Sequence, residues 1–253
     1  MGAVPALRTL TRELSALADP ERARNLAWFF KTGSGEYGEG DRFLGITVPV
    51  LRKVARGYRE LPLDGIAKLL ASEWHEHRLI ALLILVAQYA DAPDAVFDFY
   101  IAQTARINNW DLVDASAPYI AGAHLLARPR HRKLLYRFAM SDNLWERRIA
   151  IVSTLAFIRA GELDDAFAIS SRLLRDKHDL IHKAVGWMLR EAGKRDEARL
   201  LAFLRQHYAA MPRTALRYAI ERFPEPRRRQ ILRGEFWRRG ATLPPPPGCV
   251  GYG

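Results

Sequence analysis

The stretch Asn108-Asn-Trp-Asp-Leu-Val-Asp114 opens a helical segment, and its tryptophan belongs to a series that spans the chain. Tryptophans stand at 74, 110, 145 and 187, each early in a helical segment, at intervals of 36, 35 and 42 residues. A unit of two helices that recurs at such a period is typical of an α-solenoid of the HEAT type. We therefore predict an all-α solenoid whose stacked helix pairs present one concave surface.

Helical periodicity runs through most of the chain. Sustained apolar/polar alternation does not occur, and no Asn-Gly or Asp-Gly turn joins two strand-like runs. The predicted longer helices are Trp74–Tyr89, Trp110–Leu126, Leu144–Arg159, Leu180–Ala192 and Pro212–Phe223, and shorter ones lie near 93–106, 131–140, 163–175 and 196–209.

Polar residues that can cap helices precede three of the longer segments. They are Ser72, Asn108 or Asn109, and Asp142 or Asn143. Pro118 falls inside its segment and should kink the helix or end its first half.

The chain of 253 residues is predicted to hold one domain, residues 1–240, followed by a Pro- and Gly-rich flexible tail, residues 241–253. Gly33–Gly40 is predicted to be a flexible loop and not a phosphate-binding loop, because no Gly-Lys-Ser/Thr follows it. Cys249 is the only cysteine, so no intramolecular disulfide can form. With no signal peptide and no apolar run of membrane-spanning length, the expected location is the cytoplasm, at the nucleoid.

The chain is strongly basic, with 39 Lys and Arg against 28 Asp and Glu and a formal net charge of +11. Most of the cations are arginines, whose planar guanidinium suits phosphate oxygens. Nucleic acid is the favoured partner. A solvated basic surface and a scaffold that binds acidic proteins remain alternatives.

Other chemistries find little support in the sequence. His178 and His182 are four residues apart around an acid, as in some zinc sites, but no third ligand is evident. His75 and His77 are two apart, do not share a helical face, and are interpreted as surface histidines. No nucleophile elbow is present, and the lone cysteine lies in the tail. We expect no metal and no cofactor.

Trp110 and Asp114 carry the functional hypothesis. Four residues apart on a helix, they share one face about one turn apart. A carboxylate beside an indole on a cationic scaffold suits a site that stabilises a positive transition state next to an anionic polymer, as when DNA is cleaved at a sugar–base bond. The alternative, that the tryptophans are inter-repeat core, stays open.

At these residues the chain resembles the HEAT-like-repeat DNA alkylation repair glycosylases, the AlkD-like family, over roughly residues 15–235. The matching stretches are Gly35-Glu-Tyr-Gly-Glu-Gly-Asp-Arg-Phe-Leu-Gly-Ile46, Asn109-Trp-Asp-Leu-Val-Asp114, Leu144-Trp-Glu-Arg-Arg148, Lys183-Ala-Val-Gly-Trp-Met-Leu-Arg-Glu191 and Arg213-Thr-Ala-Leu-Arg-Tyr-Ala-Ile-Glu221.

The resemblance implies a role for particular residues. Asp114 matches the catalytic carboxylate, and Trp110 and Trp187 match aromatic walls that contact the deoxyribose around the lesion. Arg148 matches a cation that holds the DNA backbone. A further family aromatic, usually a tyrosine, falls near Trp28-Phe29. Phe29 is the better match, and its missing hydroxyl is a departure from the family. The matching stretches also assign Lys183, Arg190 and Arg213 to DNA binding.

The implied activity is monofunctional excision of cationic N7- and N3-alkylpurines, such as 7-methylguanine and 3-methyladenine, from duplex DNA in base excision repair. The resemblance implies that no base-flipping pocket is used. We expect a monomer with no obligate protein partner and no membrane association. The rival hypotheses are a non-catalytic member of the same fold that binds bent or branched DNA, and a HEAT scaffold for acidic proteins.

Overall fold

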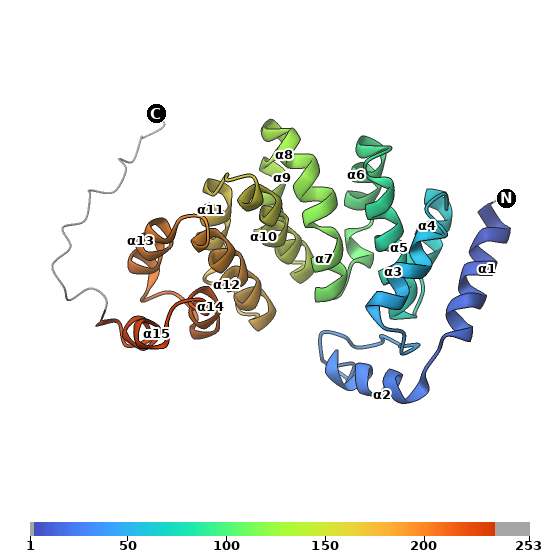
Figure 1. Cartoon of the computed structure of the whole chain (residues 1–253), viewed down its shortest axis with the longest axis horizontal. Helices are drawn as coiled ribbons and strands as arrows, with labels where there is room; N and C mark the ends of the chain where they lie inside the picture. Colours follow the sequence, from blue (N-terminus) through green and yellow to red (C-terminus); the bar gives the residue numbers. More distant parts are fainter. Residues whose placement is uncertain (1–2, 236–253) are drawn as a thin grey trace.

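A computed structural model describes residues 3–235, and the regular elements in that part of the chain are all helical (Figure 1). The only strand-like feature within the described residues is an isolated bridge between Arg42 and Trp74. The all-α prediction is therefore confirmed. No helix within residues 3–235 is long and apolar enough to cross a membrane. The predicted tail, 241–253, lies outside the described residues.

One helix of each pair forms an inner row, in which every helix packs against the next along the chain (Figure 1). The row consists of α5 (His75–Gln88), α7 (Trp110–Ser116), α10 (Leu144–Arg159), α12 (Asp179–Gly193) and α14 (Arg213–Ala219). These helices begin every 34 or 35 residues. The regular spacing and the sequential packing make the chain a solenoid.

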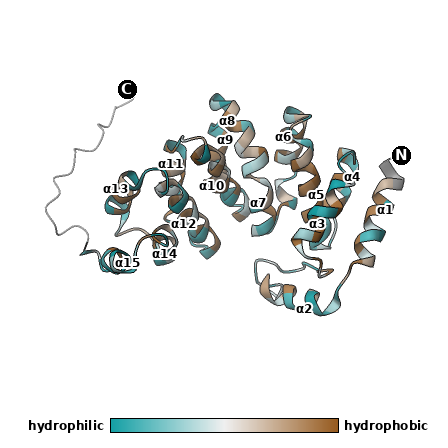
Figure 2. Ribbon diagram, viewed as in Figure 1, coloured by the Kyte–Doolittle hydropathy of each residue, from teal (hydrophilic) through white to brown (hydrophobic). Residues whose placement is uncertain are grey.

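The partner helices form an outer row that covers the other side of the inner helices. They are α4 (Leu63–Leu70), α6 (Pro93–Ala102), α9 (Lys133–Phe138), α11 (Asp164–Leu173) and α13 (Glu197–His207). Apolar side chains fill the space between the rows, and Figure 2 shows brown, hydrophobic residues along α5 and α10. The solenoid is closed by α1 (Ala3–Ala16) and α3 (Val48–Arg56) at one end and α15 (Glu225–Leu232) at the other.

The tryptophan series does not mark equivalent positions. Trp74 is the N-cap of α5, Trp110 is the first residue of α7, and Trp145 is the second residue of α10. Trp187 lies two turns inside α12, so the prediction that it stands early in its helix is wrong. The period arises from the length of chain needed for one helix pair, and the indoles occupy different places within it.

The segment that begins at Trp110 changes its helical geometry at Pro118. A π-helical turn spans Pro118–Gly122, and α8 (Ala123–Ala127) continues from it. Pro118 has no N–H to donate to the carbonyl four residues earlier, so the α-helical pattern is interrupted here. The Gly122 N–H donates to the Ala117 carbonyl, five residues earlier, at 2.8 Å, which is the π-helical pattern. The predicted interruption is thus confirmed.

The predicted caps Asn109 and Asn143 are confirmed, whereas the N-cap of α5 is Trp74 and not Ser72. The Asn109 side chain accepts a hydrogen bond from the Trp110 N–H at 2.8 Å, and Asn143 accepts one from the Trp145 N–H at 2.9 Å. The Ser72 hydroxyl accepts from the Trp74 N–H at 3.2 Å. These bonds satisfy amides at the helix starts that have no partner within the helix, and so fix where inner helices begin.

The N-terminal arm carries α2 (Pro20–Phe29) to the open side of the arch, below α3 and across from α14 in Figure 1. The chain returns through residues 31–47, which the buried carboxylate of Glu76 holds in place. Glu76 accepts hydrogen bonds from three consecutive backbone N–H groups, at 2.8 Å from Leu44, 2.7 Å from Gly45 and 3.2 Å from Ile46. Gly45 has φ +87°, and a Cβ there would lie 2.1 Å from the Asp19 carbonyl, so this close approach requires glycine.

Candidate active site

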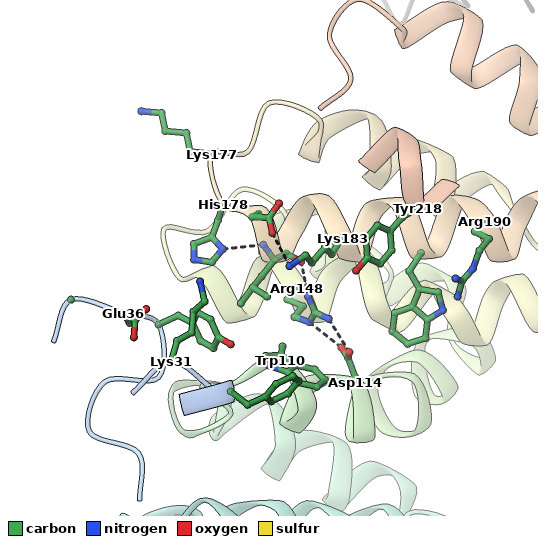
Figure 3. Close-up of a pocket in the computed structure, with 16 residues that line it drawn as sticks. Lys31, Glu36, Trp110, Asp114, Arg148, Lys177, His178, Lys183, Arg190 and Tyr218 are labelled. Atoms are coloured by element: carbon green, nitrogen blue, oxygen red, sulfur yellow. Dashed lines mark hydrogen bonds and ion pairs between the residues drawn. The ribbon is translucent and has the colours of Figure 1, made fainter. Parts of the chain in front are cut away.

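A cleft of about 710 Å³ lies between the N-terminal arm and the inner helices α7, α12 and α14 (Figure 3). Seven of the eight residues that the sequence marked for catalysis or DNA binding line it. They are Phe29, Trp110, Asp114, Arg148, Lys183, Trp187 and Arg190. Residues from four elements far apart in sequence therefore meet at one place, because successive inner helices stack side by side.

Asp114 is held by a bidentate ion pair with Arg148 from the next inner helix (Figure 3). The guanidinium donates from Nε to Oδ1 at 2.9 Å and from Nη2 to Oδ2 at 2.8 Å, and its Nη1 donates to the Leu180 carbonyl at 2.6 Å. Arg148 is only 4% exposed. The structure thus places the buried Arg148 guanidinium against the Asp114 carboxylate. The contact of Arg148 with a DNA backbone stays a prediction.

The environment of Asp114 tunes its acidity in two opposing ways. Burial raises the pKa of the Asp114 carboxyl above the usual aspartate range, and the Arg148 guanidinium opposes that rise. The side chain keeps 20% of its surface exposed, toward the cleft. A carboxylate with fixed direction and partial access is able to face a developing positive charge.

Aromatic rings from the N-terminal arm support the indole of Trp110. Phe30 stacks on it, with ring centroids 5.2 Å apart and planes 13° apart, and Phe29 meets it edge-on at 6.1 Å. Phe29 is more than half exposed and lines the cleft, whereas Phe30 is buried. Phe29 therefore offers an aromatic face to the cleft.

Tyr37 is a cleft residue that the sequence reasoning missed. It rises from the glycine-rich loop, and its ring lies edge-on to Trp145 at 6.2 Å and to His178 at 6.4 Å. A lone aromatic within a loop of small and acidic residues was the available signal. Lys31, Glu36, Lys177 and Tyr218 also line the cleft without having been predicted.

The cations of the α12 side are paired with acids near the surface. Lys183 Nζ lies 2.8 Å from Asp179, whose hydrogen bond raises the pKa of the lysine. Arg190 pairs with Glu191 at 3.2 Å and also with Glu221. These groups remain close enough to the cleft to meet a phosphate in exchange for their acids.

Arg213 is the one predicted residue that the structure does not bring to the cleft. Its guanidinium donates to the Leu232 carbonyl at 2.9 Å and to the Tyr208 hydroxyl at 3.3 Å. Leu232 is the last residue of α15, so Arg213 ties the end of that helix to the start of α14.

The histidines that the sequence analysis considered as ligands or surface residues lie in different surroundings. His178 Nδ1 accepts the Leu180 N–H at 3.2 Å as the N-cap of α12, and His182 Nε2 bonds to the Asp176 carbonyl at 2.6 Å. Among residues 3–235 no group of three or more potential ligands could hold a metal ion. His75 is only 2% exposed, so its interpretation as a surface histidine is wrong. Two carboxylates from distant segments, the buried Asp41 and the partly buried Asp111, hold its ring.

Comparison with known proteins places this geometry in a family. A family model described as DNA alkylation repair enzyme matches residues 10–223. A solved structure described as a predicted DNA alkylation repair enzyme from Enterococcus faecalis matches 82% of this chain and 97% of that chain, with a TM-score of 0.64 and 16% identity, which shows the shared fold alone. No curated protein matches the chain significantly. Since the family match covers most of the sequence, the chain belongs to the DNA alkylation repair enzyme family.

Proposed function

We propose that the protein is a DNA glycosylase that excises cationic N7- and N3-alkylpurines, such as 7-methylguanine and 3-methyladenine, from duplex DNA. The observation that carries the proposal is the aimed carboxylate of Asp114, one helical turn from Trp110 in a cleft flanked by cations. An N-alkylated purine is already a good leaving group, and the sugar becomes oxocarbenium-like as the bond to it breaks.

Asp114 would stabilise that cation electrostatically and help to position the attacking water, with the indole faces of Trp110 and Trp187 adding cation–π stabilisation. A charge pair about 4 Å apart at an effective dielectric near 20 is worth roughly 4 kcal/mol. At about 1.4 kcal/mol per decade this supports on the order of 10³ in rate. That gain suits a labile alkylated nucleotide better than an unmodified one.

Water, and not an amine of the protein, is the proposed nucleophile. Lys183 is the cleft lysine on the α12 side, and its pKa is raised by the hydrogen bond that it donates to Asp179. At neutral pH it is therefore an ammonium, which cannot attack the sugar. The expected product is an intact abasic site, as for a monofunctional glycosylase in base excision repair.

The lining of the cleft supports an approach from the sugar side, without a pocket that reads the base. Base edges are commonly read by Asn and Gln side chains through paired hydrogen bonds. No Asn or Gln is among the described residues that line the cleft. The carboxylate, the indoles and the cations instead match the charge of the sugar and phosphates. Such an enzyme would act as a monomer in the cytoplasm, at the nucleoid.

The test is product analysis on a duplex that carries one 7-methylguanine. The proposal expects release of the free base at a rate above spontaneous depurination, strand breakage only after alkali, and no release of guanine from the matched unmodified duplex. Binding with a steep salt dependence but no base release would instead indicate a non-catalytic DNA-binding protein. Absence of both would favour a scaffold for acidic proteins.

A further inference from the structure

A cluster of polar side chains is packed behind Trp110, on the side away from the cleft. It joins the loop after α2, the first turn of α5 and the start of α7, and we call it the His75 network. Its members are Asp41, His75, Arg78, Asn109 and Asp111. Four of them are less than 10% exposed, and the fifth, Asp111, has a side chain 16% exposed.

His75 lies at the centre of these contacts. Its Nε2 is 2.8 Å from Asp111 Oδ2, and its Nδ1 is 3.3 Å from Asp41 Oδ2. Asp41 also pairs with Arg78 at 2.6 Å and accepts a hydrogen bond from Asn109 Nδ2 at 3.0 Å. Asn109 and Asp111 are the sequence neighbours of Trp110, so the network holds the residue before Trp110 and the residue after it.

A second connection runs through aromatic rings. The imidazole of His75 stacks on Phe43, with centroids 4.7 Å apart, and tilts against Phe30 at 5.0 Å. Phe30 in turn stacks on Trp110 at 5.2 Å. His75 thus reaches the indole by two routes, one through the hydrogen bond to Asp111 and one through the Phe30 ring.

The charges that face the imidazole come from three elements. Asp41 in the loop and Asp111 on α7 are acidic, and Arg78 on α5 is basic; the adjacent Glu76 is committed to three backbone N–H groups. Burial alone would lower the pKa of His75, but Asp111 and Asp41 raise it to about 9. An imidazolium therefore balances the two aspartates together with Arg78 at neutral pH.

Stability alone does not account for so many buried charges, because desolvation offsets most of the attraction and an apolar cluster of the same volume often serves as well. What a fully paired network supplies is a fixed geometry. We propose that His75 is a positioning residue for excision: as an imidazolium it fixes the first turn of α7 and so holds Trp110 and Asp114 in register with the DNA. This inference rests on the proposed glycosylase function.

The first test measures excision of 7-methylguanine by full-length variants across pH. His75→Gln keeps hydrogen-bonding capacity but removes the charge. His75→Phe keeps a ring that can stack but removes both the hydrogen bonds and the charge. Both are expected to lower kcat about 10-fold while KM and DNA affinity change less than about 2-fold, the split expected when positioning and not binding is lost. The wild type should lose activity as pH rises through about 9, whereas His75→Gln should lack this alkaline limb.

His77→Gln is the matched control, because His77 lies two residues further on α5 and its Nδ1 bonds to the Ser72 hydroxyl outside the network. It should leave kcat and the pH profile unchanged. A folded His75→Gln protein that excises at the wild-type rate would overturn the inference while leaving the glycosylase proposal intact.

A second measurement is independent of activity and of whether the variants fold. In the 15N-labelled wild type, the indole N–H resonance of Trp110 should shift at the pH at which the His75 imidazole titrates. A Trp110 resonance that is indifferent to that titration would refute the positioning role even if the protein proved to have no glycosylase activity.

Discussion

The two walls of the cleft are built differently, although both come from inner helices of the same solenoid. The α7 wall presents Trp110 and Asp114, backed by stacked aromatic rings, a buried ion pair and the His75 network. The α12 wall presents Lys183, Trp187 and Arg190 on a regular helix, and its cations pair with acids near the surface.

Under the proposed function, the difference separates two tasks. A group that stabilises a transition state must be held before the reaction begins, which the α7 wall achieves by burial and paired contacts. Cations that follow a DNA backbone gain from side chains that can exchange an acid for a phosphate, as on the α12 wall. The α7 wall should therefore control rate, and the cations of the α12 wall should control affinity.

The largest effect should come from Asp114→Asn, which removes the charge of the α7 wall but keeps its shape. Excision of 7-methylguanine should fall by about one to three decades, while DNA binding stays nearly unchanged. The melting temperature should fall, because the variant leaves the buried Arg148 guanidinium without its carboxylate, so rates are compared at a temperature at which both proteins are folded. Asp111→Asn should cost less, because Asp111 bonds to His75 and does not line the cleft. If Asp111→Asn were the more damaging change, the catalytic carboxylate would be wrongly assigned.

The tryptophans test whether both walls take part in chemistry. Trp110→Ala and Trp187→Ala should each reduce excision with modest loss of stability, because both indoles are half-buried and line the cleft. Trp145→Ala is the core control: at 9% exposure its truncation should cost roughly 3–5 kcal/mol.

The double variant Trp110→Ala/Trp187→Ala should lose less than the product of the single losses, because residues that act on one transition state are not additive. Independent effects, or a melting loss for either single variant as large as that of Trp145→Ala, would argue against a shared site.

Arg148→Met tests the α7 wall through the pH dependence of the excision rate. Burial raises the pKa of Asp114 and the guanidinium lowers it, so removing the guanidinium should raise the pKa further. In the proposed mechanism the active form is the carboxylate, so activity should be lost as pH falls through that pKa. The acid limb of the rate profile should therefore move to higher pH in the variant. A lower salt slope of binding with an unmoved acid limb would instead show that Arg148 contacts phosphate.

The smallest effects should come from Lys183, Arg190 and Arg213. Lys183→Ala and Arg190→Ala should each weaken binding a few-fold and reduce the slope of log K against log salt by about one unit. Arg213→Ala should lower melting temperature, because Arg213 holds the end of α15, and should leave the salt slope near that of the wild type. A full unit lost from the slope would place Arg213 on the DNA.

The sequence predicted what depends on local periodicity and missed what depends on distant partners. Helix starts such as Trp110 and Leu144, and caps such as Asn109 and Asn143, follow from neighbouring residues, and they agree with the structure. The register of Trp187 was misjudged, because a spacing does not show where in a helix a residue falls.

Long-range contacts explain the other differences. His75 was interpreted as exposed because its partner Asp41 comes from a loop and its partner Asp111 from the next repeat. The pairing of Arg148 with Asp114 likewise spans 34 residues and leaves no local signal. Tyr37 was overlooked because glycine-rich composition suggested only flexibility, whereas the loop is held at its end by Glu76.

The most direct test of the division between the walls measures two constants on one 7-methylguanine duplex: the single-turnover excision rate at saturating protein, and the Kd. Asp114→Asn should lose rate and keep the Kd, and Lys183→Ala/Arg190→Ala should lose affinity and keep the saturated rate. Loss of rate without loss of affinity in the double lysine–arginine variant, or loss of affinity without loss of rate in Asp114→Asn, would contradict the account.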